Sequence, residues 1–368
     1  MSTRHLVLAA GGTGGHMFPA QALADEMLAR GWAVSLTTDA RGLRYAGGFN
    51  EAVERIEVRS ATFAQGRLTE RLATPVTVLR GAAATVSRFE KARPDAVAGF
   101  GGYPSIPALA AAWWLRIPRL IHEQNGVLGR VNRLAASRMD RLACGTWPLK
   151  NPPEGATLEH IGNPVRRAVI EAAATPYTPP GDGALHLAVF GGSQGASAFA
   201  RLVPQAVSLL AEAVRARLHI VQQARSGEEE SVAAAYRAAG VAGAEVAPFF
   251  ADLPARLAKA QLVIARAGAS SVAEIACIGR PSVLIPYPHA LDDHQSANAS
   301  ALEHAGAAIL APEAGLTADT LARHLRTVLL EPTRASEMAE AARSLARTDA
   351  TARLADLIET LERDSTAS

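Results

Sequence analysis

Cysteine, aromatic residues and net charge are all scarce in this sequence. It has only two cysteines, aromatic residues make up 5% of it, and its formal net charge is +2. Cys144 and Cys277 stand far apart without a CxxC or Cys/His spacing, which argues against a zinc site or a disulfide framework and fits a reducing compartment. The small net charge argues against a nucleic-acid-binding protein, because such proteins concentrate basic residues on one surface. The core must be built from Ala, Leu, Val and Ile.

Long apolar runs are missing as well. A helix that spans a bilayer needs about 20 consecutive apolar residues. The longest candidate, residues 106–115, contains Pro107 and is bounded by Pro104 and Arg116. The apolar run at residues 6–10 is shorter than the core of a signal peptide. We therefore expect any membrane contact to be peripheral.

What the sequence does contain is a regular alternation of short apolar runs and longer amphipathic stretches. In the first half it predicts strands at residues 5–10, 33–38, 96–99, 119–122 and 141–144 and helices at 18–30, 75–91, 106–115 and 130–137. In the second half it predicts strands at 185–190, 218–223, 261–265 and 281–285 and helices at 198–215, 226–239, 270–278 and 294–305. Strands separated by helices of this length pair in parallel through right-handed crossovers. The predicted fold class is α/β, with two doubly wound Rossmann-like domains facing a central cleft.

The length of 368 residues suits two domains. Proline and glycine are frequent at residues 150–183, and we place the boundary at Asn163-Pro164. The predicted domains are 1–164 and 165–346. The charged amphipathic stretch 349–364 predicts a helix, and we expect residues 347–368 to pack back on the first domain.

A glycine-rich turn follows the first predicted strand of each half: GGTGGH at residues 11–16 and GGSQGA at 191–196. Glycine lets backbone N–H groups approach an anion, and the following helix N-terminus favours negative charge. Met17 occupies the third glycine position of G-x-G-x-x-G, which argues against a nicotinamide dinucleotide. Each turn taken alone also fits an ordinary tight connection. A pyrophosphate is the natural ligand of the second.

Polar motifs follow several other predicted strands. They are FGGYPSIP at 100–107, HEQN at 122–125, RAGASSVAEIA at 266–276 and HALDDHQSANA at 289–299. Ser271 and Glu274 fit a helix-capping box, but Glu274 could instead accept hydrogen bonds from both hydroxyls of a ribose. Asp292 and Asp293 fit helix capping better than a metal site, because a third ligand is missing. We expect no metal or other cofactor.

In their order along the chain, these motifs and GNPVR at 162–166 resemble the MurG family, the UDP-N-acetylglucosamine transferases of bacterial peptidoglycan synthesis. The resemblance covers residues 6–307 and implies a GT-B glycosyltransferase fold. It implies inverting transfer of N-acetylglucosamine to the C4 hydroxyl of N-acetylmuramic acid in a pentapeptide-bearing acceptor on undecaprenyl diphosphate, which yields lipid II. A UDP-N-acetylglucosamine epimerase of the same architecture and a non-catalytic UDP-sugar sensor remain alternatives.

The resemblance also implies which residues bind substrate. The donor site would comprise Arg166, Ser193, Gln194, Phe250, Ala269, Ser270, Ser271, Val272, Ala273, Glu274 and Gln295. Arg166 would hold the diphosphate, Glu274 the ribose, Gln295 the sugar, and the main chain of Phe250 the uracil. The transferred sugar and the acceptor would meet Thr13, Gly14, Gly15 and Asn125. His16 is the candidate catalytic base, because imidazole titrates near neutral pH; it could instead bind acceptor diphosphate or shape the loop.

The lipid-linked acceptor implies a place at the cytoplasmic face of the cell membrane. Basic and apolar residues alternate at 67–93, where Arg71 and Arg80 are included, and Trp113, Trp114 and Arg116 could share that face. Such a surface would attract anionic lipids, although an ordinary packed helix with a solvated face fits the same pattern. Other cell-wall and division proteins are further expected partners.

Overall fold

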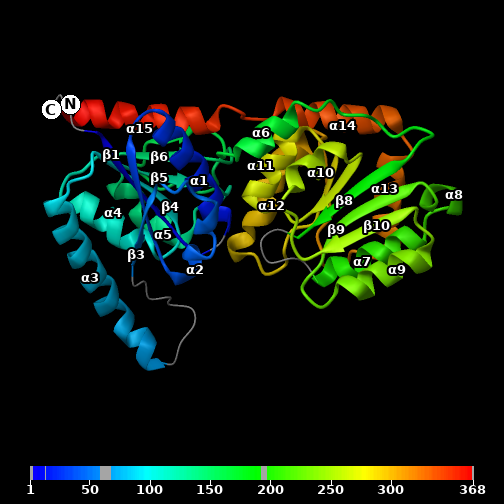
Figure 1. Cartoon of the computed structure of the whole chain (residues 1–368), viewed down its shortest axis with the longest axis horizontal. Coiled ribbons are helices and arrows are strands. Elements are labelled where there is room, and N and C mark those ends of the chain that lie inside the picture. Colours follow the sequence, from blue (N-terminus) through cyan, green and yellow to red (C-terminus); the bar gives the residue numbers. More distant parts are fainter. Residues whose placement is uncertain (1–2, 13, 59–67, 192–196, 367–368) are drawn as a thin grey trace. The chain divides into compact units, whose positions relative to one another are not determined.

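The computed structural model describes residues 3–12, 14–58, 68–191 and 197–366, with side chains in the helix 68–91 described from residue 80 onward. The chain forms two compact units (Figure 1). The first unit comprises Met1–Arg166 and Thr348–Ser368, and the second comprises Arg167–Arg347.

The first unit is built on a seven-stranded parallel sheet in the order β3-β2-β1-β4-β5-β6-β7. Its strands are β1 (His5–Ala10), β2 (Ala33–Thr38), β3 (Glu54–Glu57), β4 (Ala96–Gly101), β5 (Arg119–Glu123), β6 (Arg141–Cys144) and β7 (Leu158–His160). Its helices are α1 (Gly14–Ala29), α2 (Ala40–Leu43), η1 (Ala46–Gly48), α3 (Leu68–Lys91), α4 (Ser105–Trp114), α5 (Arg130–Ala135), η2 (Ala136–Arg138) and α15 (Ala350–Thr366).

Alternate side chains of β1 belong to two different hydrophobic cores of this unit. Leu6 and Leu8 belong to a buried cluster that includes residues of α1 and α15, whereas Val7 and Ala9 belong to a cluster with residues of α3 and α4. Successive side chains of a strand point to opposite faces, so one apolar strand supplies both layers. β1 is therefore buried on both sides, as a central parallel strand is expected to be.

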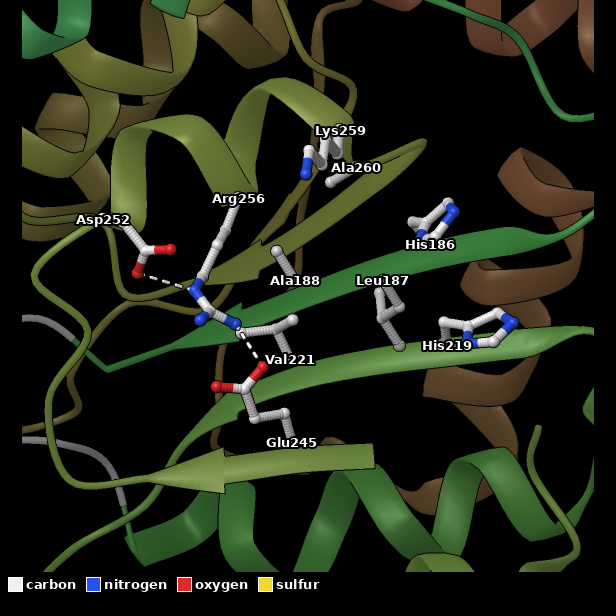
Figure 2. A pocket seen from close by; sticks show the side chains of 10 residues that line it. All are labelled: His186, Leu187, Ala188, His219, Val221, Glu245, Asp252, Arg256, Lys259 and Ala260. Atoms are coloured by element: carbon white, nitrogen blue, oxygen red, sulfur yellow. Dashed lines mark hydrogen bonds and ion pairs between the residues drawn. The ribbon is translucent and has the colours of Figure 1, made fainter. Parts of the chain in front are cut away.

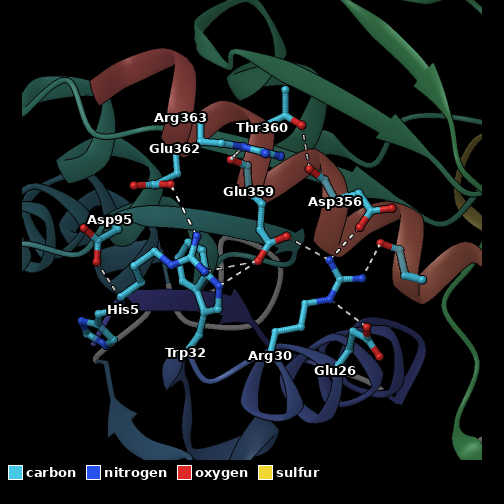
Figure 3. Close-up of polar contacts among 12 residues, drawn as sticks. His5, Glu26, Arg30, Trp32, Asp95, Asp356, Glu359, Thr360, Glu362 and Arg363 are labelled. Atoms are coloured by element: carbon cyan, nitrogen blue, oxygen red, sulfur yellow. Dashed lines mark hydrogen bonds and ion pairs between the residues drawn. The ribbon is translucent and has the colours of Figure 1, made fainter. Parts of the chain in front are cut away.

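The carboxy-terminal helix α15 completes the first unit. Leu354, Ala355 and Ile358 are buried in the same cluster as the core of α1. Arg30, just after α1, donates to Asp356 at 2.6 Å and to Glu359 at 3.1 Å (Figure 3). Apolar burial and a partly shielded ion-pair network thus hold the end of the chain against residues encoded more than 300 positions earlier.

The second unit has a six-stranded parallel sheet in the order β10-β9-β8-β11-β12-β13. Its strands are β8 (Leu185–Phe190), β9 (Leu218–Gln223), β10 (Gly243–Ala247), β11 (Leu262–Ala265), β12 (Ser282–Leu284) and β13 (Ala308–Leu310). Its helices are α6 (Arg167–Ala173), α7 (Ser197–Ser208), α8 (Glu212–Arg215), α9 (Glu229–Ala239), α10 (Leu253–Lys259), α11 (Ala269–Ile278), η3 (Leu291–Asp293), α12 (His294–His304), α13 (Ala318–Leu329) and α14 (Pro332–Ser344).

The α/β class with two Rossmann-like parallel sheets is confirmed, but some predicted elements differ. α1 begins at Gly14, earlier than predicted, because the second pair of glycines forms its first helical turn. The predicted helix 198–215 is divided into α7 and α8. Strands β3, β7, β10 and β13 were not predicted: they are short, and β3 and β10 carry charged residues at the sheet edges.

Candidate functional site

In the first unit, two glycine loops interlock at the carboxyl ends of β1 and β4. These neighbouring strands flank the point where the strand order reverses, which is where open α/β sheets bind ligands. A Cβ atom on Gly11 would lie 2.3 Å from Cγ of Pro104, and one on Gly102 would lie 2.7 Å from the carbonyl oxygen of Gly11. Ser105 Oγ donates to Gly101 O at 2.6 Å. Only glycine lets these two loops pack so closely.

The interlocked loops position His16 in the first turns of α1. Gly14 and Gly15 precede it in the helix, and Thr13 lies outside the described residues. His16 Nδ1 lies 3.0 Å from Gln124 Oε1, at the end of β5. HEQN is one of the polar motifs of the sequence, but the sequence alone predicts no role for Gln124.

Gln124 connects His16 to a second, fully buried histidine. Its Nε2 lies 3.1 Å from His122 Nδ1, and His122 Nε2 lies 3.0 Å from the carbonyl oxygen of Gly162. Burial is the main cause that lowers the pKa of His122 to about 4. The hydrogen bond to Gly162 O raises this pKa, and the neighbouring His16 lowers it. His122 is therefore neutral at physiological pH.

The loop that follows β5 is organised by a buried carboxylate. Glu123 Oε1 accepts from the backbone N–H and the Nδ2 of Asn125, both at 3.0 Å. Its Oε2 accepts from Gly129 N and Asn132 Nδ2, both at 2.9 Å. The amide of Asn125, a predicted acceptor-site residue, is thus oriented by Glu123 at the same sheet edge as His16.

Arg166 lies at the end of the first unit's main segment. Its guanidinium carbon is 4.6 Å from the centroid of the Phe18 ring, one turn into α1. The planar guanidinium can stack on an aromatic face while its N–H groups remain oriented for an anion. The structure thus places Arg166 beside the helix that follows the first glycine loop.

In the second unit, the predicted run 269–274 forms the start of α11, after β11. The helix begins at Ala269, and its N-cap residue, Gly268, makes no side-chain capping bond. The capping-box interpretation of Ser271 and Glu274 is therefore wrong, because the helix starts before Ser271. Among the described residues, the buried Ser270 Oγ has no hydrogen-bond partner, and the first backbone N–H groups of a helix have no acceptor within it.

Glu274 lies one turn further along α11, together with the predicted residues Val272 and Ala273. Its side chain is 6% exposed. A carboxylate buried beside a helix N-terminus can accept two hydrogen bonds at once, which suits the adjacent hydroxyls of a ribose.

Arg266, which sequence reasoning did not select, braces the loops around α11. Its Nη1 donates to the carbonyl oxygens of Ile285 at 3.2 Å and Pro286 at 3.0 Å, and its Nη2 pairs with Glu313. It thereby links the carboxyl ends of β11, β12 and β13. The sequence feature that could have identified Arg266 is its position directly after a buried strand.

Gln295 and the aspartates before it surround the start of α12. Gln295 Oε1 accepts from Tyr287 N at 2.8 Å. Asp293 is the N-cap of α12, but its carboxylate accepts from Ser296 Oγ at 2.7 Å and makes no bond to a backbone N–H. The predicted capping is therefore wrong for Asp293, whose side chain makes no capping bond to α12. Within the described ranges, no group of three His, Cys, Asp or Glu could hold a metal ion.

Phe250 follows β10 and is buried, with the Arg256 guanidinium 4.5 Å from its ring centroid. Gln223 connects this segment to the second glycine loop: its Oε1 accepts from Gly191 N at 3.2 Å and its Nε2 donates to Pro248 O at 3.0 Å. Ser193 and Gln194 lie outside the described residues.

The second unit also has a hollow that does not fit the predicted nucleotide site (Figure 2). His186 and His219, which lie near the amino ends of β8 and β9, line it. Its Arg256 is paired with Asp252 at 2.7 Å and Glu245 at 2.5 Å. Ligands of open α/β sheets bind at the opposite, carboxyl edge.

An exposed tryptophan pair marks another surface of the first unit. Trp113 and Trp114 at the end of α4 are 46% and 71% exposed, and they line a hollow with Arg116 and Arg119. Arg138 lies over the Trp113 ring at 5.5 Å. In the described part of the chain, no helix is long and apolar enough to cross a membrane.

Comparison with known proteins identifies the family. Residues 6–144 match the glycosyltransferase family 28 N-terminal domain, and residues 186–361 match the glycosyltransferase family 28 C-terminal domain. A protein from Chelativorans sp. (strain BNC1), named UDP-N-acetylglucosamine–N-acetylmuramyl-(pentapeptide) pyrophosphoryl-undecaprenol N-acetylglucosamine transferase, is 48% identical over 98% of this chain and 96% of its own length. A protein of the same name from Brucella abortus (strain S19) is 50% identical over 97% of this chain and 94% of its own length.

A solved structure supports the same family. The crystal structure of Acinetobacter baumannii MurG is 31% identical, with a TM-score of 0.78, over 97% of this chain and 99% of that one. The chain belongs to the MurG family. It is a glycosyltransferase, and its two Rossmann-like units are those of the GT-B fold of that family.

Proposed function

We propose that this MurG-family chain transfers N-acetylglucosamine from UDP-N-acetylglucosamine to the C4 hydroxyl of N-acetylmuramic acid in an undecaprenyl-diphosphate-linked pentapeptide acceptor. The product is lipid II, a precursor of peptidoglycan. The observation that carries the proposal is the identity, close to half of all positions over nearly the whole chain, to transferases named for this reaction. The same observation disfavours an epimerase or a non-catalytic sensor.

The donor is proposed to bind the second unit. Glu274 would accept from the ribose hydroxyls, and the main chain at Phe250 would pair with the uracil. The N-terminus of α11, with its uncapped N–H groups and the buried Ser270 hydroxyl, supports an anionic guest such as a diphosphate. Arg166, Ser193 and Gln194 are proposed to share the diphosphate, and Gln295 the sugar.

The acceptor and the transferred sugar are proposed to meet Thr13, Gly14, Gly15, His16 and Asn125 in the first unit. His16 would take the proton of the acceptor hydroxyl, whose oxygen then bonds to the anomeric carbon. The bond from that carbon to the diphosphate breaks, and its electron pair leaves with UDP. A single displacement of this kind inverts the anomeric configuration.

No metal or other cofactor is proposed for this reaction. Backbone N–H groups at helix N-termini and the Arg166 guanidinium would stabilise the charge that grows on UDP. UDP release in buffer with EDTA, equal to release with added Mg²⁺, is the expected result. Complete dependence on added metal would contradict it.

Acceptor-dependent UDP release tests the proposed reaction. The chain is incubated with UDP-N-acetylglucosamine, with and without a soluble analogue of the lipid-linked acceptor. We expect UDP only when the acceptor is present. Isomer formation without acceptor would instead support an epimerase, and binding without turnover a sensor.

Single variants test the base. His16→Ala should lower kcat by about a hundredfold or more at saturating acceptor, the range of general base catalysis. His304→Ala is the control, because the one hydrogen-bond partner of this exposed histidine within the described ranges is the carbonyl oxygen of Ser300 on its own helix. Near-normal turnover of His16→Ala would remove the base role.

We also propose that the chain works peripherally at the cytoplasmic face of the membrane. The exposed Trp113 and Trp114 and the arginines beside them support contact with an anionic surface. Arg93 adds a further positive charge, since its Nη2 donates to Leu115 O at 2.9 Å at the end of α4. Cell-wall and division proteins are proposed as additional partners.

Vesicle co-sedimentation tests the membrane contact. Binding to vesicles that contain phosphatidylglycerol should exceed binding to neutral vesicles, and Arg80→Glu with Arg116→Glu should abolish the difference. Arg237→Glu is the control, because this exposed arginine lies in the second unit and pairs with Glu230. Equal binding by all variants would contradict the proposed surface.

A further inference from the structure

Two backbone carbonyls fix the orientation of the Gln124 amide behind His16. Gln124 Nε2 lies 3.1 Å from Phe100 O and 3.0 Å from His122 O. Carbonyl oxygens only accept hydrogen bonds, so the NH₂ group must face them. The amide oxygen Oε1 therefore has to face His16.

This orientation determines where His16 carries its proton. Nδ1 of His16 lies 3.0 Å from Gln124 Oε1, which can only accept. Nδ1 must therefore be the protonated nitrogen. In a neutral imidazole the other nitrogen, Nε2, then holds the basic lone pair. Nε2 has no hydrogen-bond partner among the described residues.

His122 holds the far side of the amide by the same logic. Its Nε2 lies 3.0 Å from Gly162 O, so Nε2 carries the proton and Nδ1 accepts from Gln124 Nε2 at 3.1 Å. Because His122 is fully buried and stays neutral, Nδ1 keeps its acceptor role at physiological pH. The two N–H groups of the Gln124 amide face three acceptors, Phe100 O, His122 O and His122 Nδ1, and are shared among them. None of these three contacts conflicts with the donor role of Nε2, which leaves Oε1 to face His16.

We propose that Gln124 is a positioning residue that fixes His16 in the tautomer whose Nε2 is the basic nitrogen, with His122 holding the amide in place. This inference rests on the proposed function, in which His16 takes the acceptor proton. After Nε2 takes that proton, Nδ1–H keeps its bond to Gln124, so the ring does not need to turn during the reaction.

The tautomers can be observed directly by NMR of the whole chain labelled with ¹⁵N-histidine. The spectrum of His16→Ala identifies the His16 signals among the ten histidines of the sequence. In the neutral form of His16 we expect a protonated Nδ1 and an unprotonated Nε2. A proton on Nε2 of neutral His16 would overturn the inference, whatever the activity of the protein.

Two replacements of Gln124 separate positioning from packing. Gln124→Met keeps the length of the side chain but offers no oxygen acceptor to His16. By analogy with the loss of a partner that orients a metal-ligating histidine, it should lower kcat about ten- to a hundredfold. The KM for UDP-N-acetylglucosamine should stay within about twofold, since the donor is proposed to bind other residues. Gln124→Glu in its protonated form can direct its O–H at the carbonyl oxygens of Phe100 and His122 and its other oxygen at His16. It should therefore keep the Nδ1–H tautomer and retain more activity than Gln124→Met.

Gln222→Met provides the matched control. Gln222 is also a buried glutamine, but it lies in the second unit and its Oε1 accepts from the Tyr236 hydroxyl. Its kcat should equal that of the unmodified chain. A wild-type kcat in Gln124→Met, or equal losses in Gln124→Met and Gln222→Met, would overturn the inference. If the unmodified chain released no UDP with acceptor, the proposed function would fail, while the NMR measurement would still decide the tautomer.

Discussion

Replacing Gly101 with alanine tests whether the close packing behind His16 controls both stability and turnover. Gly101 ends β4 with a φ of 95°, a backbone conformation that side chains of L-residues rarely adopt. A Cβ atom there would lie 3.1 Å from Cε1 and 3.3 Å from Nδ1 of His16. The added methyl group would therefore strain the backbone and press on the ring that Gln124 holds.

The expected cost combines backbone strain with displacement of the ring. A left-handed backbone costs an L-residue about 1–2 kcal/mol. Moving His16 off its rotamer costs about 1 kcal/mol more, and weakening its bond to Gln124 costs up to about 1 kcal/mol. We expect Gly101→Ala to lose about 3 kcal/mol of unfolding free energy. A misplacement of about 1 Å can cost a hundredfold in rate, so kcat should fall at least about tenfold.

Two other glycines separate these contributions. Gly155 has a φ of 73° with nothing near its Cβ position, so Gly155→Ala should show only the backbone strain, about 1–2 kcal/mol. Gly47 has neither constraint, and Gly47→Ala should change stability by less than about 0.5 kcal/mol. Urea unfolding and acceptor-dependent UDP release measure the two effects. The reasoning is refuted if Gly101→Ala matches Gly155→Ala in stability and keeps the original kcat.

Three further results are expected. Glu274→Gln should weaken UDP binding about ten- to a hundredfold, since hydrogen bonds to a charged group are worth about 1.5–3 kcal/mol; calorimetric titration that gave an unchanged affinity would exclude its ribose role. Between pH 6.5 and 4 the unfolded chain binds a proton at His122 that the folded chain does not, so stability should fall by about 3 kcal/mol as the pH is lowered through this window. His122→Gln should flatten that slope in urea unfolding at several pH values, and an equal slope would show that His122 is not buried in its neutral form. Arg30→Met removes one partner each of Asp356 and Glu359 and should cost about 1–2 kcal/mol. Hydrogen exchange should rise in α15 and stay unchanged in the second unit, and unchanged exchange in α15 would show that these ion pairs do not hold α15 in place.

The buried strands were the part of the fold that sequence pattern predicted best. β1, β2, β6, β8 and β9 have the predicted bounds. β1 and β8 are buried at all but one residue and are mostly apolar, as strands covered on both faces are, whereas β9 alternates between buried and more exposed residues. β3 and β10 escaped prediction because edge strands bury little surface, so their sequences, ERIE and GAEVA, carry no apolar run. Pairing with a neighbour makes them strands, and that neighbour is distant in the sequence.

The site was predictable as motifs but not as contacts. GGTGGH and HEQN were both recognised, yet the bond between His16 and Gln124 joins residues 108 positions apart. Local spacing also misled: Ser271 and Glu274 fit a capping box, but the short connection after β11 starts the helix at Ala269. Parallel sheets bring the ends of non-adjacent segments together, so contacts at those ends depend on strand order more than on local pattern.

The position of α15 has a consequence for synthesis on the ribosome. The first unit lacks part of its core until Leu354, Ile358 and Leu361 have been made, although most of it is translated first. The second unit, Arg167–Arg347, is a continuous stretch and can fold as soon as it emerges. The nascent amino-terminal half would therefore wait with an apolar face open to chaperones, and the half made later would be the first to reach its native state.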